Sequence, residues 1–170
     1  MHKLLYVFLL IGFTAIAQPA RLEMVAGVFA PVTAKIADTP SDKFLDMTRN
    51  WAEEFNRRQG SSYDISGVTE TSVTVSAYKK NAFFYRNKGE AFDFRIRYDM
   101  KIDFTRTEYS VTFTVKEIYG KNDEVIQSTI GDYYTSDGSL KEGFADVEKS
   151  LEATVNNIVT SHNNFIKNFR

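Results

Sequence analysis

The chain has 170 residues, a formal net charge of −1, 43% hydrophobic residues and no cysteine. The lack of cysteine excludes a disulfide framework, a thiolate nucleophile, a cysteine-rich zinc site and a lipid-modified cysteine anchor. A charge this close to zero gives no long-range field toward nucleic acid or an anionic membrane, so we expect no nucleic-acid partner.

Residues 1–17 have the pattern of an export signal. A short basic start precedes a mostly apolar run over residues 4–16, and Ala15 and Ala17 form a small-x-small cleavage site. The run is shorter than the roughly 20 residues that span a bilayer, and no later segment approaches that length. We therefore predict a signal peptide followed by one α+β domain at residues 18–170. We expect the protein to be exported, in the periplasm of a Gram-negative bacterium, and not to be a lipoprotein or to have a transmembrane segment after signal removal.

Residues 18–38 carry only a weak pattern. Their apolar residues would supply a first strand, which Gly27 would break and Pro31 would end. These apolar residues are Leu22, Met24, Val25, Val28 and Phe29.

The next segment predicts a helix over residues 40–58. Thr39 is placed to cap it, with Pro40 as the first helical residue and Gly60 as the stop signal. One apolar stripe recurs at spacings of three and four residues, the period of a helix that packs on a core. The stripe consists of Phe44, Met47, Thr48, Trp51 and Phe55. We expect Trp51 to pack against the sheet.

Residues 61–91 are typical of strands and turns. Val73, Val75 and Ala77 alternate with polar residues, and three adjacent aromatics at residues 83–85 precede a turn at 86–89. Three aromatics in a row cover both faces of a strand. Either another element shields the outer face, or the aromatics form a contact surface for a partner.

The central stretch, residues 92–104, alternates without exception between apolar even positions and charged odd positions. A second alternation occupies residues 109–119, after a turn centred on Arg106 and Thr107. A period of two indicates half-buried strands. The turn predicts an antiparallel hairpin that puts every apolar residue on one face. Its expected pairs are Phe104 with Tyr109, Ile102 with Val111, Met100 with Phe113, and Tyr98 with Val115.

The opposite face of this hairpin carries six charges on the first strand that sum to zero, with Thr and Ser opposite them. Antiparallel sheets commonly leave one such face to solvent. If this face and the aromatic strand bind a partner, the binding residues are Arg95, Arg97, Asp99 and Lys101 together with Phe84 and Tyr85.

The last third of the chain predicts one more strand and the longest helix. Residues 120–123 read as a turn, 125–130 as a strand and 131–138 as a loop. Ser139 and Glu142 have the spacing of a capping box, which would start a helix over residues 140–167.

Signatures of catalysis or of cofactor binding are largely missing. His162 is the one histidine beyond the first residues and lies on an apolar helix stripe, and no nucleophile elbow or phosphate-binding loop occurs. We therefore expect no metal, no cofactor and no enzymatic activity. A weaker alternative is a hydrolase that uses converging carboxylates, drawn from Asp99, Asp103, Glu108 and Asp132.

Several local runs carry a family resemblance. They are Asp64-Ile65-Ser66-Gly67, Asn81-Ala82-Phe83-Phe84-Tyr85-Arg86-Asn87-Lys88-Gly89, Arg97-Tyr98-Asp99-Met100, Phe113-Thr114-Val115-Lys116-Glu117-Ile118-Tyr119 and Val155-Asn156-Asn157-Ile158. The chain resembles, best over residues 40–160, a family of small exported bacterial proteins of unknown function with a TBP-like fold. The resemblance implies a curved antiparallel sheet with helices on one side, and it implies no activity. The near-neutral sheet face gives no support for DNA binding, and fold likeness is not function.

We predict an α+β fold with a curved antiparallel sheet of five or six strands and two main helices packed on one face. The expected function is binding of a protein or other envelope partner through the open sheet face. The alternative is a small apolar or lipid-like ligand in a pocket between sheet and helices, lined by Trp51, Tyr98, Phe113 and Phe144. The oligomeric state is left open.

Overall fold

The computed structural model describes residues 21–169, so the predicted signal peptide lies outside the described residues. The elements in chain order are β1 (Met24–Val25), β2 (Val28–Phe29), β3 (Val32–Lys35), α1 (Ser41–Gln59), β4 (Tyr63–Ser66), β5 (Ser72–Asn87), β6 (Glu90–Phe104), β7 (Glu108–Tyr119), β8 (Val125–Ile126), the 3-10 helix η1 (Ile130–Tyr133) and α2 (Ala145–Asn168).

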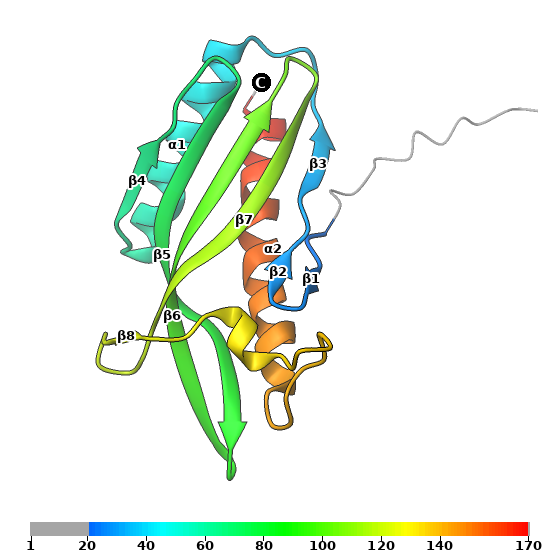
Figure 1. The fold of residues 1–170 in the computed structure, drawn as a ribbon. Helices are drawn as coiled ribbons and strands as arrows, with labels where there is room; N and C mark the ends of the chain where they lie inside the picture. The colour runs from blue at the N-terminus through cyan, green and yellow to red at the C-terminus, as the bar shows by residue number, and fades with distance from the viewer. Residues whose placement is uncertain (1–20, 170) are drawn as a thin grey trace, which may run out of the picture.

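One antiparallel sheet organises the molecule. Its strands follow the order β3-β7-β6-β5-β4, with β8 added on β7, and β1 and β2 form a separate small hairpin. Both helices lie on the same side of this sheet (Figure 1). The predicted α+β class, with a six-stranded sheet and helices on one face, is confirmed. Within residues 21–169, neither helix is both long enough and apolar enough to cross a membrane.

The predicted central hairpin is confirmed with its register. Phe104 faces Tyr109, Ile102 faces Val111, Met100 faces Phe113, and Tyr98 faces Val115. The backbone N–H of Thr105 donates to Glu108 across the turn. The apolar residues of both strands point toward the helices, because a strand alternates its side chains between two faces.

The predicted first strand is wrong in its position. Residues 24–29 fold into the β1–β2 hairpin, and β3, which lies beyond Pro31, is the strand that joins the main sheet beside β7. Gly27 has a φ of +84° in the hairpin turn, and a Cβ there would come within 2.8 Å of the backbone N of Gly131. The weak alternation of this segment reflects a tight local turn and not one continuous strand.

Polar side chains of α2 hold the N-terminal segment against that helix. Asn156 accepts a hydrogen bond from the backbone N–H of Leu22 and donates one to the Leu22 carbonyl, each at 2.9 Å. The Glu152 carboxylate accepts from the N–H of Met24 at 2.7 Å. Phe29 then packs edge-on against Phe113 of β7. The β1–β2 hairpin therefore lies beside α2 on the helix-covered face.

The first helix begins one residue later than predicted. Pro40 is the N-cap residue and α1 starts at Ser41, while the Thr39 hydroxyl donates to the carbonyl of Ala37 and does not cap the helix. The predicted end is confirmed, because Gly60 adopts a left-handed conformation and its N–H returns to the last turn.

The start of the second helix was predicted wrongly. The proposed capping box at Ser139 and Glu142 does not form, and α2 begins at Ala145. Gly143 has a φ of +86°, which a right-handed helix cannot accommodate, so the chain makes a β-bridge from Leu140 to Tyr134 and a turn at 142–143 before α2 begins. The capping box that does form joins Thr129 to Asp132 at the start of η1. The strand predicted over residues 125–130 is correspondingly reduced to β8.

The interior between sheet and helices is filled by aromatic and aliphatic side chains. Phe44 of α1 stacks on Phe104 of β6 at 4.6 Å, and Tyr98 stacks on Phe113 at 4.7 Å. At the opposite end the long β5–β6 hairpin extends past the other strands (Figure 1). There Phe83 stacks on Phe94 at 5.0 Å.

Candidate functional site

The open face of the sheet holds the four charged residues predicted for it. Arg95, Arg97, Asp99 and Lys101 are odd-numbered residues of β6, whose even-numbered neighbours are buried beneath the helices. Alternation therefore places these four side chains together on the uncovered side.

Most charges on this face are paired with one another. Arg97 forms an ion pair with Glu117 at 3.2 Å, and Lys101 forms one with Asp103 at 2.9 Å. Asp99 accepts a hydrogen bond from Ser76 of β5 at 2.6 Å. The open face is thus a polar surface with compensated charge and not a positive or negative field.

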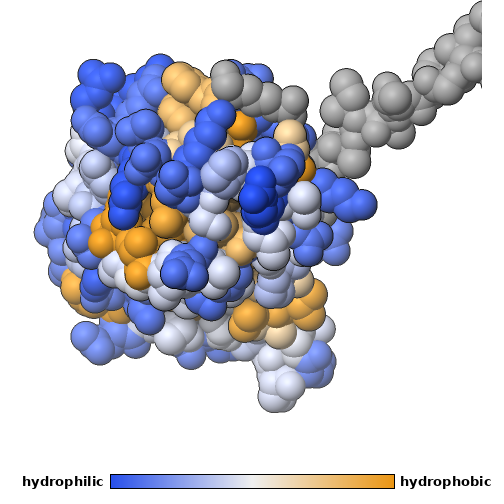
Figure 2. Space-filling model, turned by 90° about the horizontal axis from the view of Figure 1, so that it is seen from above, coloured by the Kyte–Doolittle hydropathy of each residue, from blue (hydrophilic) through white to orange (hydrophobic). Residues whose placement is uncertain are grey.

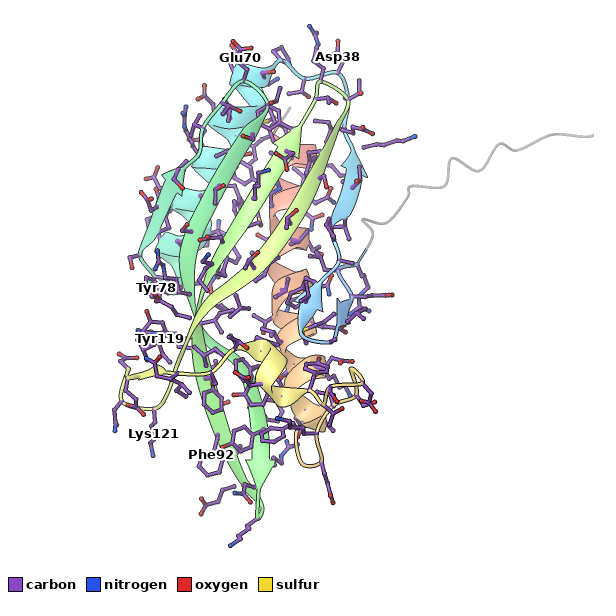
Figure 3. All side chains as sticks on the ribbon, viewed as in Figure 1. Asp38, Glu70, Tyr78, Phe92, Tyr119 and Lys121 are labelled. Carbon is purple, nitrogen blue, oxygen red and sulfur yellow. The ribbon has the colours of Figure 1, made fainter. Side chains whose placement is uncertain are left out.

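Arg95 has a different environment from the other charged residues of the face. Its guanidinium lies over two tyrosine rings, 4.3 Å from the centroid of Tyr119 and 5.2 Å from that of Tyr78. One terminal nitrogen pairs with Asp123 at 3.1 Å, and the buried Nε has no hydrogen-bond partner among the described residues. The side chain is 22% exposed, against 54% for Lys101. Figure 3 shows Tyr78 and Tyr119 near each other on one side of the sheet.

A β-bulge brings Tyr119 onto the open face. Tyr98 pairs with Val115, whereas the residue before it in β6, Arg97, pairs with Glu117. Lys116 is therefore an extra residue in β7. The extra residue shifts the alternation, and Tyr119 therefore pairs with Arg95 on the same face. Neither Tyr78 nor Tyr119 is among the site residues predicted from the sequence. The bulge does have a signal in the sequence, because the two adjacent charged residues at 116 and 117 interrupt an otherwise regular alternation.

Hydrogen bonds link this tyrosine to the neighbouring ion pair. The Tyr119 hydroxyl donates to Glu117, and this bond, supported by the attraction of Arg97, lowers the pKa of Glu117. The same bond raises the pKa of Tyr119. Glu117 is consequently ionised and Tyr119 neutral at neutral pH, which keeps the cluster in one protonation state.

The two aromatic residues predicted for the binding face lie on opposite sides of β5. Phe84 pairs with Asp93, so it points to the side of the odd-numbered β6 residues, with the Arg86 guanidinium 4.9 Å above its ring. Tyr85 pairs with Phe92 and packs edge-on against Phe144 at 5.1 Å. The structure therefore does not bring Tyr85 to the open face.

The four residues predicted to line one pocket lie in three separate clusters. Tyr98 and Phe113 stack on each other in the core, where each is at most 2% exposed. Trp51 packs on Phe55 and donates to Ser161 of α2, and Phe144 packs at the far end of the molecule. Side chains fill the space between sheet and helices at these positions.

A groove does lie between the outer surfaces of the two helices. It has a volume of about 510 Å³, and its apolar lining comes from Trp51, Phe55, Phe165 and Phe169. Phe169 is 58% exposed. Figure 2, seen from above, shows that the apolar surface occurs as patches between hydrophilic side chains.

Three of the four carboxylates considered for hydrolysis have separate structural partners. Asp99 binds Ser76, Asp103 pairs with Lys101, and Asp132 accepts from Thr129. Within residues 21–169, no three histidine, cysteine, aspartate or glutamate side chains gather as a metal site.

His162 belongs to the core of the molecule. Its Nε2 lies 3.2 Å from the Thr48 hydroxyl, and the rings of Phe44, Trp51 and Tyr109 surround it. Complete burial lowers the pKa of His162 to about 3. The imidazole is therefore neutral and structural at physiological pH.

Comparison with known proteins identifies the fold. Neither a family model nor a curated protein sequence matches the chain. The chain is similar to the crystal structure of a DUF4468 family protein from Bacteroides ovatus ATCC 8483, with a TM-score of 0.52, 10% identity and 85% of both chains covered. It is also similar to that of a TBP-like protein from Parabacteroides distasonis ATCC 8503, with a TM-score of 0.47, 12% identity, and 80% of this chain and 86% of that one covered. The chain thus shares its fold with a DUF4468 family protein, in agreement with the predicted resemblance to a family of unknown function.

Proposed function

We propose that this chain is a non-enzymatic binding domain that recognises a protein partner in the cell envelope through its open sheet face. The observation that carries the proposal is the Tyr78–Arg95–Tyr119 cluster, which lies on the uncovered face. Tyrosine and arginine are the residue types that most often dominate binding energy at protein interfaces. A side chain already held between two rings also loses little conformational entropy when a partner binds.

The charge pattern favours a protein over a nucleic acid as the partner. Arg97, Lys101 and Lys116 each have a carboxylate within 4 Å, so the face offers alternating donors and acceptors without an excess of positive charge. Nucleic-acid binding depends on such an excess to neutralise phosphates. A compensated face instead supports specificity through complementary polar contacts.

Site-specific photocrosslinking tests the proposal. A photoreactive phenylalanine analogue replaces Thr112 on the open face or Lys149 on the exposed outer face of α2, in cells that naturally produce the chain. We expect one defined adduct from position 112 and none from position 149. Equal labelling from both positions would contradict recognition by the sheet face.

Charge reversal then tests the partner that the crosslink identifies. Lys101→Glu on the open face should weaken the affinity of the purified pair by roughly tenfold, as loss of an interface contact of about 1.4 kcal/mol does. Lys149→Glu, the matched control on α2, should leave the affinity unchanged. Both variants should keep the melting temperature of the native chain, because both side chains are exposed.

Export to the periplasm is part of this proposal. The basic start, apolar run and Ala15-Ile16-Ala17 site support it. Mass spectrometry of the protein recovered from its native cells should find a mature N-terminus at Gln18. A chain that keeps residues 1–17 in the cytoplasm would refute export.

A small apolar or lipid-like ligand is the second candidate, and the groove between α1 and α2 favours it. Its volume of about 510 Å³ falls within the usual range for small-molecule sites, and four aromatic side chains line it. Saturating fatty acids should raise the melting temperature of the native chain. The increase should be smaller for Phe165→Ala. A variant outside the groove that is destabilised to the same degree serves as the control and should keep the full increase.

A further inference from the structure

A cleft borders the open face where the loop after α1 meets β5, β6 and β7. It has a volume of about 390 Å³ and is lined by Gly60, Ser61, Ser62, Tyr78, Lys80, Arg95 and Tyr119. Both charged lining residues are cationic. The remaining lining consists of two serines, two tyrosines and a glycine, which supply hydroxyl and backbone groups.

The two cations are held at this position by irregularities in the sheet. In β5 the pairing with β6 shifts between Lys79 and Phe83, so Lys80 lies in the irregular stretch, and Asn81 within it has a φ of +49°. In β7 the bulge at Lys116 places Tyr119 beside Arg95. Bulges are over-represented next to functional sites, because they redirect side chains that a regular ladder would place elsewhere.

Arg95 has hydrogen-bonding capacity that the described protein does not use. A guanidinium carries five N–H donors. The contact within hydrogen-bonding distance that the structure shows for it is the ion pair with Asp123. Asp123 itself is 70% exposed and lies on the turn between β7 and β8 with a φ of +60°. Because the Asp123 side of this pair is exposed on a surface turn, its carboxylate is weakly held and is readily exchanged for another anion.

The charges that line the cleft also favour an anion, and the ionised Glu117 that accepts from Tyr119 is compensated by Arg97. Lys80 is exposed and forms no ion pair within residues 21–169, and Lys121 lies on the turn beyond Tyr119 (Figure 3). The carboxyl end of α1 approaches the cleft with its partial negative charge, which Arg57 in the last helical turn offsets, while Arg58 pairs with Glu54. Asp123 is then the internal group that occupies Arg95 in the absence of a ligand.

We infer that this cleft binds a small oxyanion, a carboxylate or a phosphate, which displaces Asp123 from Arg95 and is held by Arg95 and Lys80. The aromatic rings of Tyr78 and Tyr119 fix the plane of the guanidinium, and planar guanidinium groups match the two oxygens of a carboxylate or phosphate. Asp123 acts as an internal competitor that sets the affinity. This inference and the proposed function both use the Tyr78–Arg95–Tyr119 cluster, but they are tested separately, because the anion titration needs only free anions and the isolated chain.

Titration of the purified protein with anions, monitored by nitrogen–proton NMR, tests whether the cleft binds an oxyanion. Sodium phosphate and sodium acetate form two arms that distinguish the two oxyanions, with sodium chloride at equal ionic strength as the reference. We expect saturable shifts of the Arg95 Nε–H resonance and of the Tyr78 and Tyr119 amides in at least one arm. Identical shifts with chloride, or no saturation in either arm, would overturn the inference.

Three variants make the test specific. Arg95→Gln should weaken binding by roughly tenfold or more, because hydrogen bonds to a charged group are lost. Asp123→Asn should strengthen binding by about threefold, because the competing charge is removed, and asparagine tolerates the left-handed conformation of this turn. Lys149→Gln, on the exposed outer face of α2 and away from the cleft, should bind as the native chain does.

Arg95→Gln is expected to weaken anion binding and Asp123→Asn to strengthen it, so the inference can still be tested if Arg95→Gln unfolds. Asp123 is exposed, so Asp123→Asn retains the fold, and its affinity alone then decides. Unchanged or weaker anion binding by Asp123→Asn would overturn the competitor role. An equal loss in Lys149→Gln and Arg95→Gln would indicate general charge screening and not a site.

Discussion

The two faces of the central sheet come from the same strands and have opposite physical roles. On the covered face, Ile96, Tyr98, Met100 and Ile102 are fully buried under the helices. On the open face, the residues between them form ion pairs and hydrogen bonds that remain in contact with solvent. Stability therefore depends on one face, and the other is free to be used for binding.

The difference has a simple energetic basis. Burying a large apolar side chain contributes about 1.5–3 kcal/mol, and losing one from a packed core costs more because a cavity remains. Exposed ion pairs contribute little, because water screens them and ordering the side chains costs entropy. Substitutions on the covered face should consequently change the stability of the fold, and substitutions on the open face should change only the binding of a partner.

The largest effect is expected from an aromatic residue of α1 that packs against the covered face. Phe44→Ala should lower the free energy of unfolding by about 3–5 kcal/mol, because Phe44 is fully buried and stacks on Phe104. Phe84→Ala, a half-buried aromatic on the other side of the sheet, is the matched control and should cost much less. Urea denaturation followed by circular dichroism measures both, and equal losses would contradict the contrast between the faces.

A pH-dependent loss of stability should come from the covered face as well. Burial lowers the pKa of His162 to about 3, against about 6.5 in an unfolded chain. Between these values the unfolded chain binds more protons, so stability falls as the pH drops, by at most about 1.4 kcal/mol per pH unit.

Denaturation at pH 7, 6 and 5 measures this slope. The variant His162→Gln lacks the titrating group and should show a flatter dependence, although it is less stable at pH 7. Most carboxylates titrate below this range. An unchanged slope in His162→Gln would show that other groups cause the acid sensitivity.

A smaller effect is expected where the N-terminal hairpin joins the covered face. Asn156→Ala removes both hydrogen bonds to the backbone of Leu22 and should cost about 1–3 kcal/mol. Hydrogen exchange at residues 22–29 should accelerate more than elsewhere. The adjacent exposed residue provides the control, since Asn157→Ala should alter neither quantity.

The smallest effect is expected on the open face. Lys101→Ala removes the ion pair with Asp103, yet the free energy of unfolding should stay within about 0.5 kcal/mol of the native value. Thermal denaturation at low and high salt measures this. A loss comparable with that of Phe44→Ala would show that the open face is structural and not available for a partner.

Much of the sheet could be predicted because its information is local. Six successive odd positions of β6 are charged, so only one orientation of this strand keeps all of these charges in solvent. A slip of one residue would expose every apolar side chain. The apolar stripe and Gly60 likewise defined α1 to within one residue. The positions of Arg95, Arg97, Asp99 and Lys101 on a common face followed from the same period.

Predictions failed where a local signal competed with a backbone constraint. Ser139 and Glu142 have capping-box spacing, but the left-handed conformation of Gly143 separates them from α2. Tyr85 was grouped with Phe84 because three aromatics in a row do not show which ones point outward. Its partners Phe92 and Phe144 come from other elements, so pairing had to be known first.

The residues of single segments were sufficient to predict the α+β class, the central hairpin with its register, both main helices and the polar character of the open face. These features depend on periodicity within short segments, which each segment carries in its own residues. Only the tertiary structure decided that Tyr78, Lys80, Arg95, Tyr119 and Asp123 meet around one cleft. That meeting depends on two sheet irregularities and a turn, whose combined geometry is set by packing between strands that are distant in sequence.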